Sequence, residues 1–103
     1  MTRPGDSPLR IGMLGVGTVG SALATLMQER PELRLVKALV RDVAKPRKIA
    51  HPEAVLTTDP DEVLAEADVL VEVMGGTSLA VDVTRRALDA GLPGVTANKA
   101  ALA

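Results

Sequence analysis

Residues 9–20 decide the fold of this chain. They read Leu-Arg-Ile-Gly-Met-Leu-Gly-Val-Gly-Thr-Val-Gly, an apolar run that leads into three glycines. The run from Leu9 to Leu14 is short, apolar and ended by a glycine, which predicts a buried strand. From Thr18 to about Arg30, apolar residues recur at the spacing of one helix face, at Val19, Ala22, Leu23, Leu26 and Met27. The stretch therefore predicts a strand, a glycine turn and an amphipathic helix.

The three glycines form the pattern G-x-G-x-x-G between that strand and that helix. In a dinucleotide-binding turn, Gly15 permits the tight bend, Gly17 leaves room for a pyrophosphate, and Gly20 lets the helix pack close to the strand. The free N–H groups at the start of the helix then favour an anion. A glycine turn without a ligand is the alternative. It is less expected, because three glycines weaken a helix start.

The rest of the chain alternates between strand and helix patterns. Strands are predicted at residues 33–40, 54–57, 69–74 and 94–97, with a loop at 41–52 that holds at most a short helix. One helix is predicted to start at Asp59-Pro60, and another at Thr77 or Ser78 and to end at Gly91. This alternation predicts a single α/β domain over residues 1–103, a doubly wound Rossmann-type parallel sheet of five strands in the order 3-2-1-4-5, truncated before its last strand.

Composition excludes several classes of function. The 103 residues carry a net charge of -1 and no aromatic residue, so neither a basic field nor aromatic stacking is present for nucleic acid. There is no cysteine, and the single histidine, His51, is expected in a surface loop, so no metal site is predicted. No membrane span or secretory signal is evident, which makes a cytoplasmic protein the expectation.

Cofactor preference depends on the end of the second strand, where Arg41 and Asp42 follow Val40. A guanidinium at this place can hold the 2′-phosphate of NADP through paired, charge-assisted bonds, and Lys45 or Lys48 could assist. A carboxylate there can instead accept the ribose hydroxyls of NAD. Arg41 favours NADP, and Asp42 keeps NAD open as the alternative.

Two further pairs close strands at the ligand-binding edge of the sheet. Gly75-Gly76 follows the fourth strand and Asn98-Lys99 follows the fifth, so both are candidates to line the nicotinamide end of a cofactor, with a plain turn as the alternative. Glu72 lies inside a strand that should be buried, and it therefore needs a partner or an exposed edge. We expect that it could face a part of the protein beyond this chain.

Four blocks of the chain together resemble homoserine dehydrogenase. They are Gly-Val-Gly-Thr-Val-Gly at 15–20, Val-Arg-Asp at 40–42, Val-Glu-Val-Met-Gly-Gly at 71–76 and Val-Thr-Ala-Asn-Lys-Ala at 95–100. The resemblance covers nearly the whole chain from Leu9 onward, and the last block is its most specific part. It implies an oxidoreductase that reduces aspartate 4-semialdehyde to homoserine with NADPH or NADH, on the route to threonine, methionine and isoleucine.

The resemblance also implies roles for single residues. The glycine turn, with Thr18 and Val19, binds the cofactor pyrophosphate, and Arg41 contacts the adenosine phosphate. Asn98 lies by the nicotinamide. Lys99 is the catalytic residue, which helps to move the proton that accompanies hydride transfer, a role that a lowered pKa would favour.

The chain departs from the family at Ala103, where it ends. Family members also carry a substrate domain and a dimerisation region, so the full-length protein is expected to be a homo-oligomer that acts on a small molecule. The chain is therefore expected to be a fragment or an unusual stand-alone domain, inactive by itself. The alternatives are another Rossmann dehydrogenase that acts on an amino acid or a sugar, and a stand-alone nucleotide-binding regulatory module.

Overall fold

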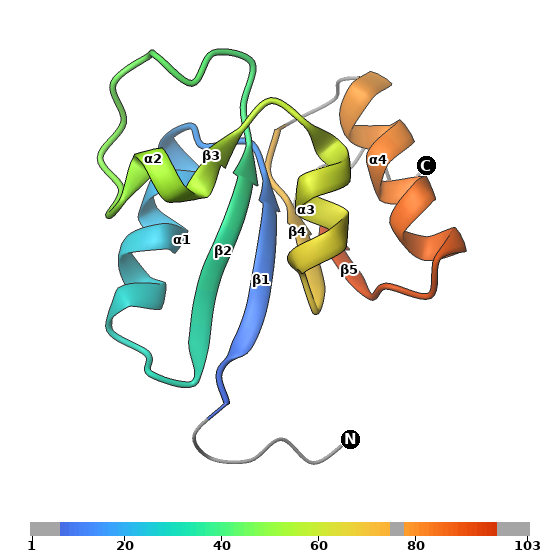
Figure 1. The fold of residues 1–103 in the computed structure, drawn as a ribbon, viewed down its shortest axis with the longest axis horizontal. Helices are drawn as coiled ribbons and strands as arrows, with labels where there is room; N and C mark the ends of the chain where they lie inside the picture. The colour runs from blue at the N-terminus through green and yellow to red at the C-terminus, as the bar shows by residue number, and fades with distance from the viewer. Residues whose placement is uncertain (1–6, 75–77, 97–103) are drawn as a thin grey trace.

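The computed structural model describes residues 7–74 and 78–96, which form one parallel sheet with helices on both faces (Figure 1). The strands lie in the order β3-β2-β1-β4-β5, and every pair is parallel. This confirms the predicted Rossmann-type α/β fold and its strand order. In chain order the elements are β1 (Leu9–Leu14), α1 (Thr18–Gln28), β2 (Leu33–Leu39), α2 (Pro52–Val55), β3 (Leu56–Thr57), α3 (Pro60–Glu66), β4 (Val69–Glu72), α4 (Ser78–Asp89) and β5 (Gly94–Thr96).

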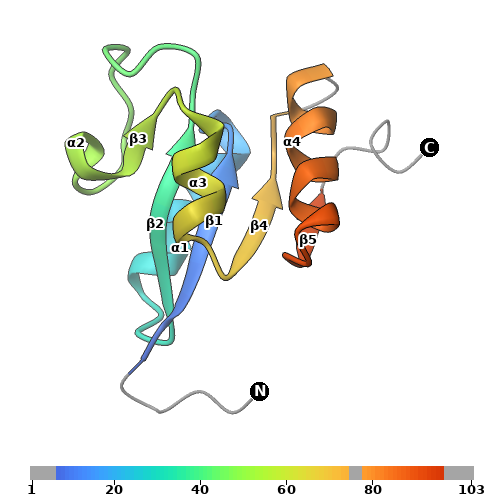
Figure 2. The same cartoon turned by 45° about the vertical axis from the view of Figure 1, so that its right-hand side comes forward.

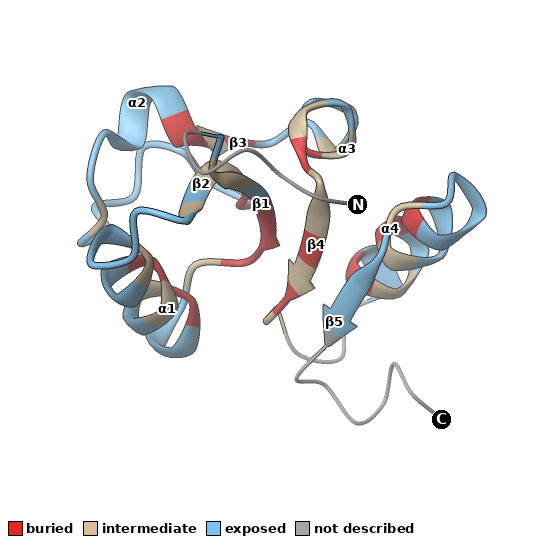
Figure 3. Cartoon of the chain, turned by 90° about the horizontal axis from the view of Figure 1, so that it is seen from below, coloured by how far each residue is buried: buried red, intermediate tan, exposed pale blue. Residues whose placement is uncertain are grey.

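A separate apolar cluster packs on each face of the sheet. Helix α1 covers one face, and α3 and α4 cover the other (Figure 2). Alternate residues of one strand point to opposite faces, so Met13 belongs to the cluster beneath α1, while Leu14 belongs to the cluster beneath α3 and α4. Residues 11–14 of β1, the central strand, are all buried, whereas Gly94 and Val95 of β5, at one edge of the sheet, are exposed (Figure 3).

Helix α1 turns only part of its predicted face to the sheet, since Leu23 and Met27 pack against the core and Val19 and Leu26 do not. Val19 and Leu26 are 55% and 58% exposed, whereas Gly20 and Ala24 are buried. The small side chains face the sheet because they let the helix approach β1 closely, and Leu23 fills the space beside them. The apolar spacing predicted the helix correctly, but the prediction of its buried face was partly wrong.

The third strand is shorter than predicted. Residues 54 and 55 lie in α2, and β3 pairs only Leu56 and Thr57 with the end of β2. His51 is exposed and has a positive φ of 53°, and Pro52 follows at the first helical position. Proline at that position favours a helical turn, which is how residues 52–55 leave the extended conformation.

Glycine 12 brings α3 close to β1. A Cβ at Gly12 would lie 2.7 Å from the Cβ of Ala67 and 2.8 Å from Cγ1 of Val63. Both distances are far inside ordinary carbon contact, so only glycine fits here without a shift of the helix. The sequence pattern gave no sign of this role, because Gly12 stands inside an otherwise apolar run.

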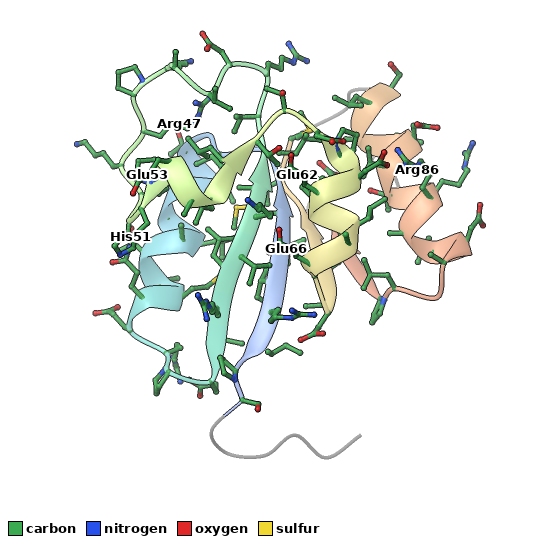
Figure 4. All side chains as sticks on the ribbon, viewed as in Figure 1. Arg47, His51, Glu53, Glu62, Glu66 and Arg86 are labelled. Carbon is green, nitrogen blue, oxygen red and sulfur yellow. The ribbon has the colours of Figure 1, made fainter. Side chains whose placement is uncertain are left out.

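Charged side chains tie the outer elements together. Lys37, on β2, donates to the carbonyl oxygen of Ala54 at 2.9 Å, and its Nζ lies 3.6 Å and 3.8 Å from carboxylate oxygens of Glu62 and Glu66. Figure 4 labels both glutamates on α3, together with Arg86 on α4, which forms an ion pair with Asp61. These links join α2 and α3 to β2, and α4 to α3.

Two kinds of feature are absent from the described part of the chain. None of its helices has the length and apolar character that crossing a bilayer requires. Over the same residues, no three histidine, cysteine or acidic side chains gather in a way that could hold a metal ion.

Candidate functional site

The turn after β1 is bent at Gly15, which has a φ of +92°. A side chain would be strained in this conformation, and a Cβ would also lie 2.7 Å from Cγ of Met74. The amide of Gly15 donates to the carbonyl of Leu39 at 2.8 Å, so the turn begins at the ends of β1 and β2. The structure thus confirms the tight bend predicted at Gly15.

The other two glycines of the motif differ in what surrounds them. A Cβ at Gly20 would lie 2.8 Å from the carbonyl oxygen of Gly15, so this position needs glycine for close packing. A Cβ at Gly17 would meet nothing within 4 Å. Gly17 is the N-cap of α1, and the amide of Ser21 donates to its carbonyl at 2.8 Å. The turn therefore presents open space in front of the first N–H groups of an 11-residue helix.

A surface pocket of about 410 Å³ occupies that space. Val16, Gly17, Thr18 and Ser21 line one side of it, and residues 45–48 line the other. These last residues belong to the long connection between β2 and α2, which leaves the carboxyl end of β2 and arches above the start of α1 (Figure 1). Ligands of open α/β sheets bind at this end of the strands. The pocket joins the glycine turn to two lysines, Lys45 and Lys48.

A larger pocket of about 470 Å³ lies elsewhere, between the second half of α1, the first half of β2 and residues 49–55. It lies away from the carboxyl ends of the strands. Size alone would favour it, but the fold places ligands at the other end of the sheet, and we therefore regard the pocket at the glycine turn as the candidate site.

The connection after β2 carries the predicted specificity residues. Arg41 is exposed, and its side chain makes no hydrogen bond or ion pair with residues 7–74 or 78–96. Asp42 turns back on its own loop, because its Oδ1 accepts a hydrogen bond from the amide of Ala44 at 2.9 Å. One carboxylate oxygen of Asp42 is thus already engaged in the structure.

Arg47 holds the same loop, a role that sequence reasoning missed. Its Nη1 donates to the carbonyl oxygen of Asp42 at 2.6 Å and to that of Lys45 at 3.0 Å (labelled in Figure 4). Bonds from a side chain to nearby carbonyls leave no periodic signal, and the only clue in the sequence is an arginine among lysines in a loop rich in breakers.

Glu72 is buried at 1% exposure, and its Oε2 accepts a hydrogen bond from the amide of Met74 at 2.6 Å. The expectation that it could face a part of the protein beyond this chain was wrong. Its carboxylate instead holds the backbone just after β4, at Met74, which lies beside Gly15. The need for a partner inside a buried strand was correctly predicted.

The remaining predicted site residues, Gly75, Gly76, Asn98 and Lys99, lie outside the described residues. The two strands that precede them in the sequence, β4 and β5, do lie within the described residues. Leu14 at the end of β1 pairs with Glu72 at the end of β4, and Glu72 pairs with Thr96 at the end of β5. The last residues of these three strands therefore lie at one edge of the sheet, the edge of the glycine turn.

Residues 15–103 match the protein family described as "Homoserine dehydrogenase, NAD binding domain". Homoserine dehydrogenase from Synechocystis sp. is 39% identical in an alignment 105 residues long, which covers 92% of this chain and 24% of that protein. The enzyme from Bacillus subtilis is 34% identical over 102 residues, 88% of this chain and 24% of the relative. A crystal structure of S. aureus homoserine dehydrogenase has a TM-score of 0.80 at 36% identity, covering 90% of this chain and 26% of that one. This chain spans about a quarter of the length of these relatives.

Proposed function

Because this chain belongs to the family of homoserine dehydrogenase NAD-binding domains, we propose that its glycine turn holds the pyrophosphate of a nicotinamide dinucleotide. The observation that carries the proposal is the open space at Gly17, where a pocket faces the start of α1. Thr18 and Val19 supply the first N–H groups of that helix, and the helix dipole favours an anion there. Gly15 and Gly20 keep the turn tight and the helix close to it.

We propose further that the cofactor is NADP. Arg41 is exposed at the end of β2, where a guanidinium can make paired bonds to a 2′-phosphate. Lys45 and Lys48 line the pocket and add positive charge. The competing preference, for NAD, would use the carboxylate of Asp42, but one oxygen of that carboxylate already accepts the amide of Ala44. This bond leaves the carboxylate less available to the ribose hydroxyls of NAD, which favours NADP.

The reaction that we propose for the full protein is reduction of aspartate 4-semialdehyde to homoserine. The bound cofactor supplies the hydride, and Lys99 moves the proton that accompanies it. Asn98, Gly75 and Gly76 line the nicotinamide end. Since the chain spans only a quarter of its relatives' length, residues 1–103 alone are expected to bind cofactor without turning over substrate. The full protein would work as a homo-oligomer in the cytoplasm.

A titration with NADPH and NADH, followed by nicotinamide fluorescence, tests the cofactor proposal. We expect tighter binding of NADPH, with most of the difference lost in Arg41→Ala and unchanged in Arg85→Ala, which removes the same charge from an exposed position on α4. Gly17→Ala should fold normally, because its Cβ meets nothing, and should bind both cofactors at least tenfold more weakly. Equal binding of NADPH and NADH by the unmodified chain would overturn the NADP preference. Unchanged binding by folded Gly17→Ala would overturn the pyrophosphate site.

A further inference from the structure

We propose that Arg47 is a positioning residue of the cofactor site, which fastens residues 42–47 so that Lys45 and Lys48 face the glycine turn. This inference rests on the proposed function and adds a residue that the phosphate contacts do not require directly. The juxtaposition that supports it is a guanidinium that donates to two carbonyl oxygens of its own loop, at a residue that lines the pocket between the two lysines.

Arg47 differs from the other cations of its loop. Arg41, Lys45 and Lys48 are exposed, whereas Arg47 is partly buried. Its Nη1 makes two hydrogen bonds, to the carbonyl oxygens of Asp42 and Lys45. A guanidinium held at two carbonyls has less freedom to follow a ligand, so its main effect is on the conformation of the loop.

The loop has few other bonds that could hold it. Within residues 41–48 the remaining hydrogen bonds are Ala44 N to Oδ1 of Asp42 at 2.9 Å and the long contact of Lys45 N to the carbonyl of Asp42 at 3.4 Å. Three of these four interactions converge on Asp42, two of them on its carbonyl oxygen. Loops of this length without helix or strand are mobile unless such bonds hold them. Removing the guanidinium of Arg47 therefore removes two of these four hydrogen bonds, those to the carbonyl oxygens of Asp42 and Lys45.

A fixed loop matters for affinity because the lysines are flexible. Each long side chain loses rotamer freedom when it contacts a phosphate, and an unfixed backbone would add its own ordering cost. With the loop held by Arg47, Lys45 and Lys48 start from the pocket wall beside Gly17 and Thr18. Loss of Arg47 is expected to weaken NADPH binding by about five- to tenfold, even though its own guanidinium points at carbonyl oxygens.

The experiment combines Arg47→Ala and Arg47→Lys with the surface control Arg85→Ala. Backbone ¹⁵N relaxation is measured on the cofactor-free chain, and NADPH affinity is measured by fluorescence titration. In Arg47→Ala the order parameters of Ala44 and Lys45 should fall from rigid values to below about 0.6, while those of β1 and β4 stay unchanged. Arg47→Lys keeps the charge but loses the planar fork, so its order parameters and its affinity should both fall between those of the other two chains.

The outcomes distinguish the positioning role of Arg47 from the binding of cofactor by the chain. Weaker NADPH binding in Arg47→Ala together with a mobile loop supports the positioning role. Weaker binding with an unchanged loop, and full recovery in Arg47→Lys, would overturn it in favour of direct charge contact. Unchanged binding and an unchanged loop would overturn it outright. Failure of the unmodified chain to bind NADPH would refute the proposed function and the cofactor role of Arg47, while the relaxation data would still decide whether Arg47 holds the loop.

Discussion

Replacing Gly12 by alanine tests whether α3 is positioned by the missing side chain of β1. The new methyl group would lie 2.7 Å from the Cβ of Ala67 and 2.8 Å from Cγ1 of Val63, where carbon atoms ordinarily stay about 3.5–4.0 Å apart. Rotation cannot relieve the contact with Ala67, because a Cβ has no rotamer, and Val63 is fully buried and β-branched. The helix or the strand must therefore move.

The expected cost follows from two opposing effects. Overpacking of a well-packed interior typically costs about 1–3 kcal/mol. Alanine also reduces the conformational entropy of the unfolded chain, which returns about 0.4–1 kcal/mol. The two ranges together allow a net loss of up to about 2.5 kcal/mol in the free energy of unfolding, and two contacts below 3 Å place Gly12→Ala in the upper part of that range, at about 1–2.5 kcal/mol. For a domain of this size the midpoint of thermal unfolding would fall by roughly 4–8 °C per kcal/mol.

Urea unfolding followed by far-UV circular dichroism measures this difference, since the chain has no aromatic residue for fluorescence. The matched control is Gly94→Ala in β5, where a Cβ would meet the carbonyl oxygen of Leu70 at 3.6 Å, an ordinary contact. That variant should be as stable as the unmodified chain or slightly more so. A Gly12→Ala chain as stable as Gly94→Ala would refute the idea that the missing Cβ sets the distance between α3 and β1.

Two further variants test the ends and edges of the fold by the same urea assay. Asp59→Ala removes the cap whose Oδ1 accepts the amide of Asp61 at 2.9 Å, and should cost about 1 kcal/mol; no loss would mean that α3 starts without its cap. Lys37→Met keeps the apolar stem but removes the charge that reaches Ala54 and two glutamates of α3, and should cost about 1–2 kcal/mol, less at high salt. The exposed Lys48→Met serves as its control, and an equal change in both would refute a specific role for Lys37.

The strand order could be predicted from the sequence because one rule covers every connection. The chain passes to a parallel neighbour from β1 to β2, from β2 to β3 and from β4 to β5, and after β3 it crosses to β4 on the other side of β1. Such crossovers are almost always right-handed. The glycine turn was predictable for a similar reason, since Gly15, Gly17 and Gly20 have distinct steric needs at fixed offsets, and the structure reproduces the bend at Gly15 and the close packing at Gly20. The cofactor roles of these residues stay predictions.

What the sequence could not predict depends on packing between distant residues. Which face of α1 is buried depends on how closely Gly20 and Ala24 can approach the sheet, and apolar spacing alone favours the larger Val19 and Leu26. The role of Gly12 appears only once α3 is placed against it.

The loop after β2 was unpredictable for another reason. Its conformation depends on hydrogen bonds between side chains and carbonyl oxygens, which follow no periodic pattern. Arg47 could be recognised only from the positions of its two acceptors.

The shortness of β3 has a consequence for how this domain behaves in concentrated solution. β3 pairs only with Ala38 and Leu39, so within the described chain the outer edge of β2 from Leu33 to Lys37 has no strand beside it. An apolar strand with an open edge is a template on which other chains can add strands, and proteins commonly oppose such growth with charges on the edge. Here Arg34 and Lys37 interrupt the apolar residues of β2. We therefore expect Arg34 and Lys37 to oppose the addition of another strand at this edge of the sheet.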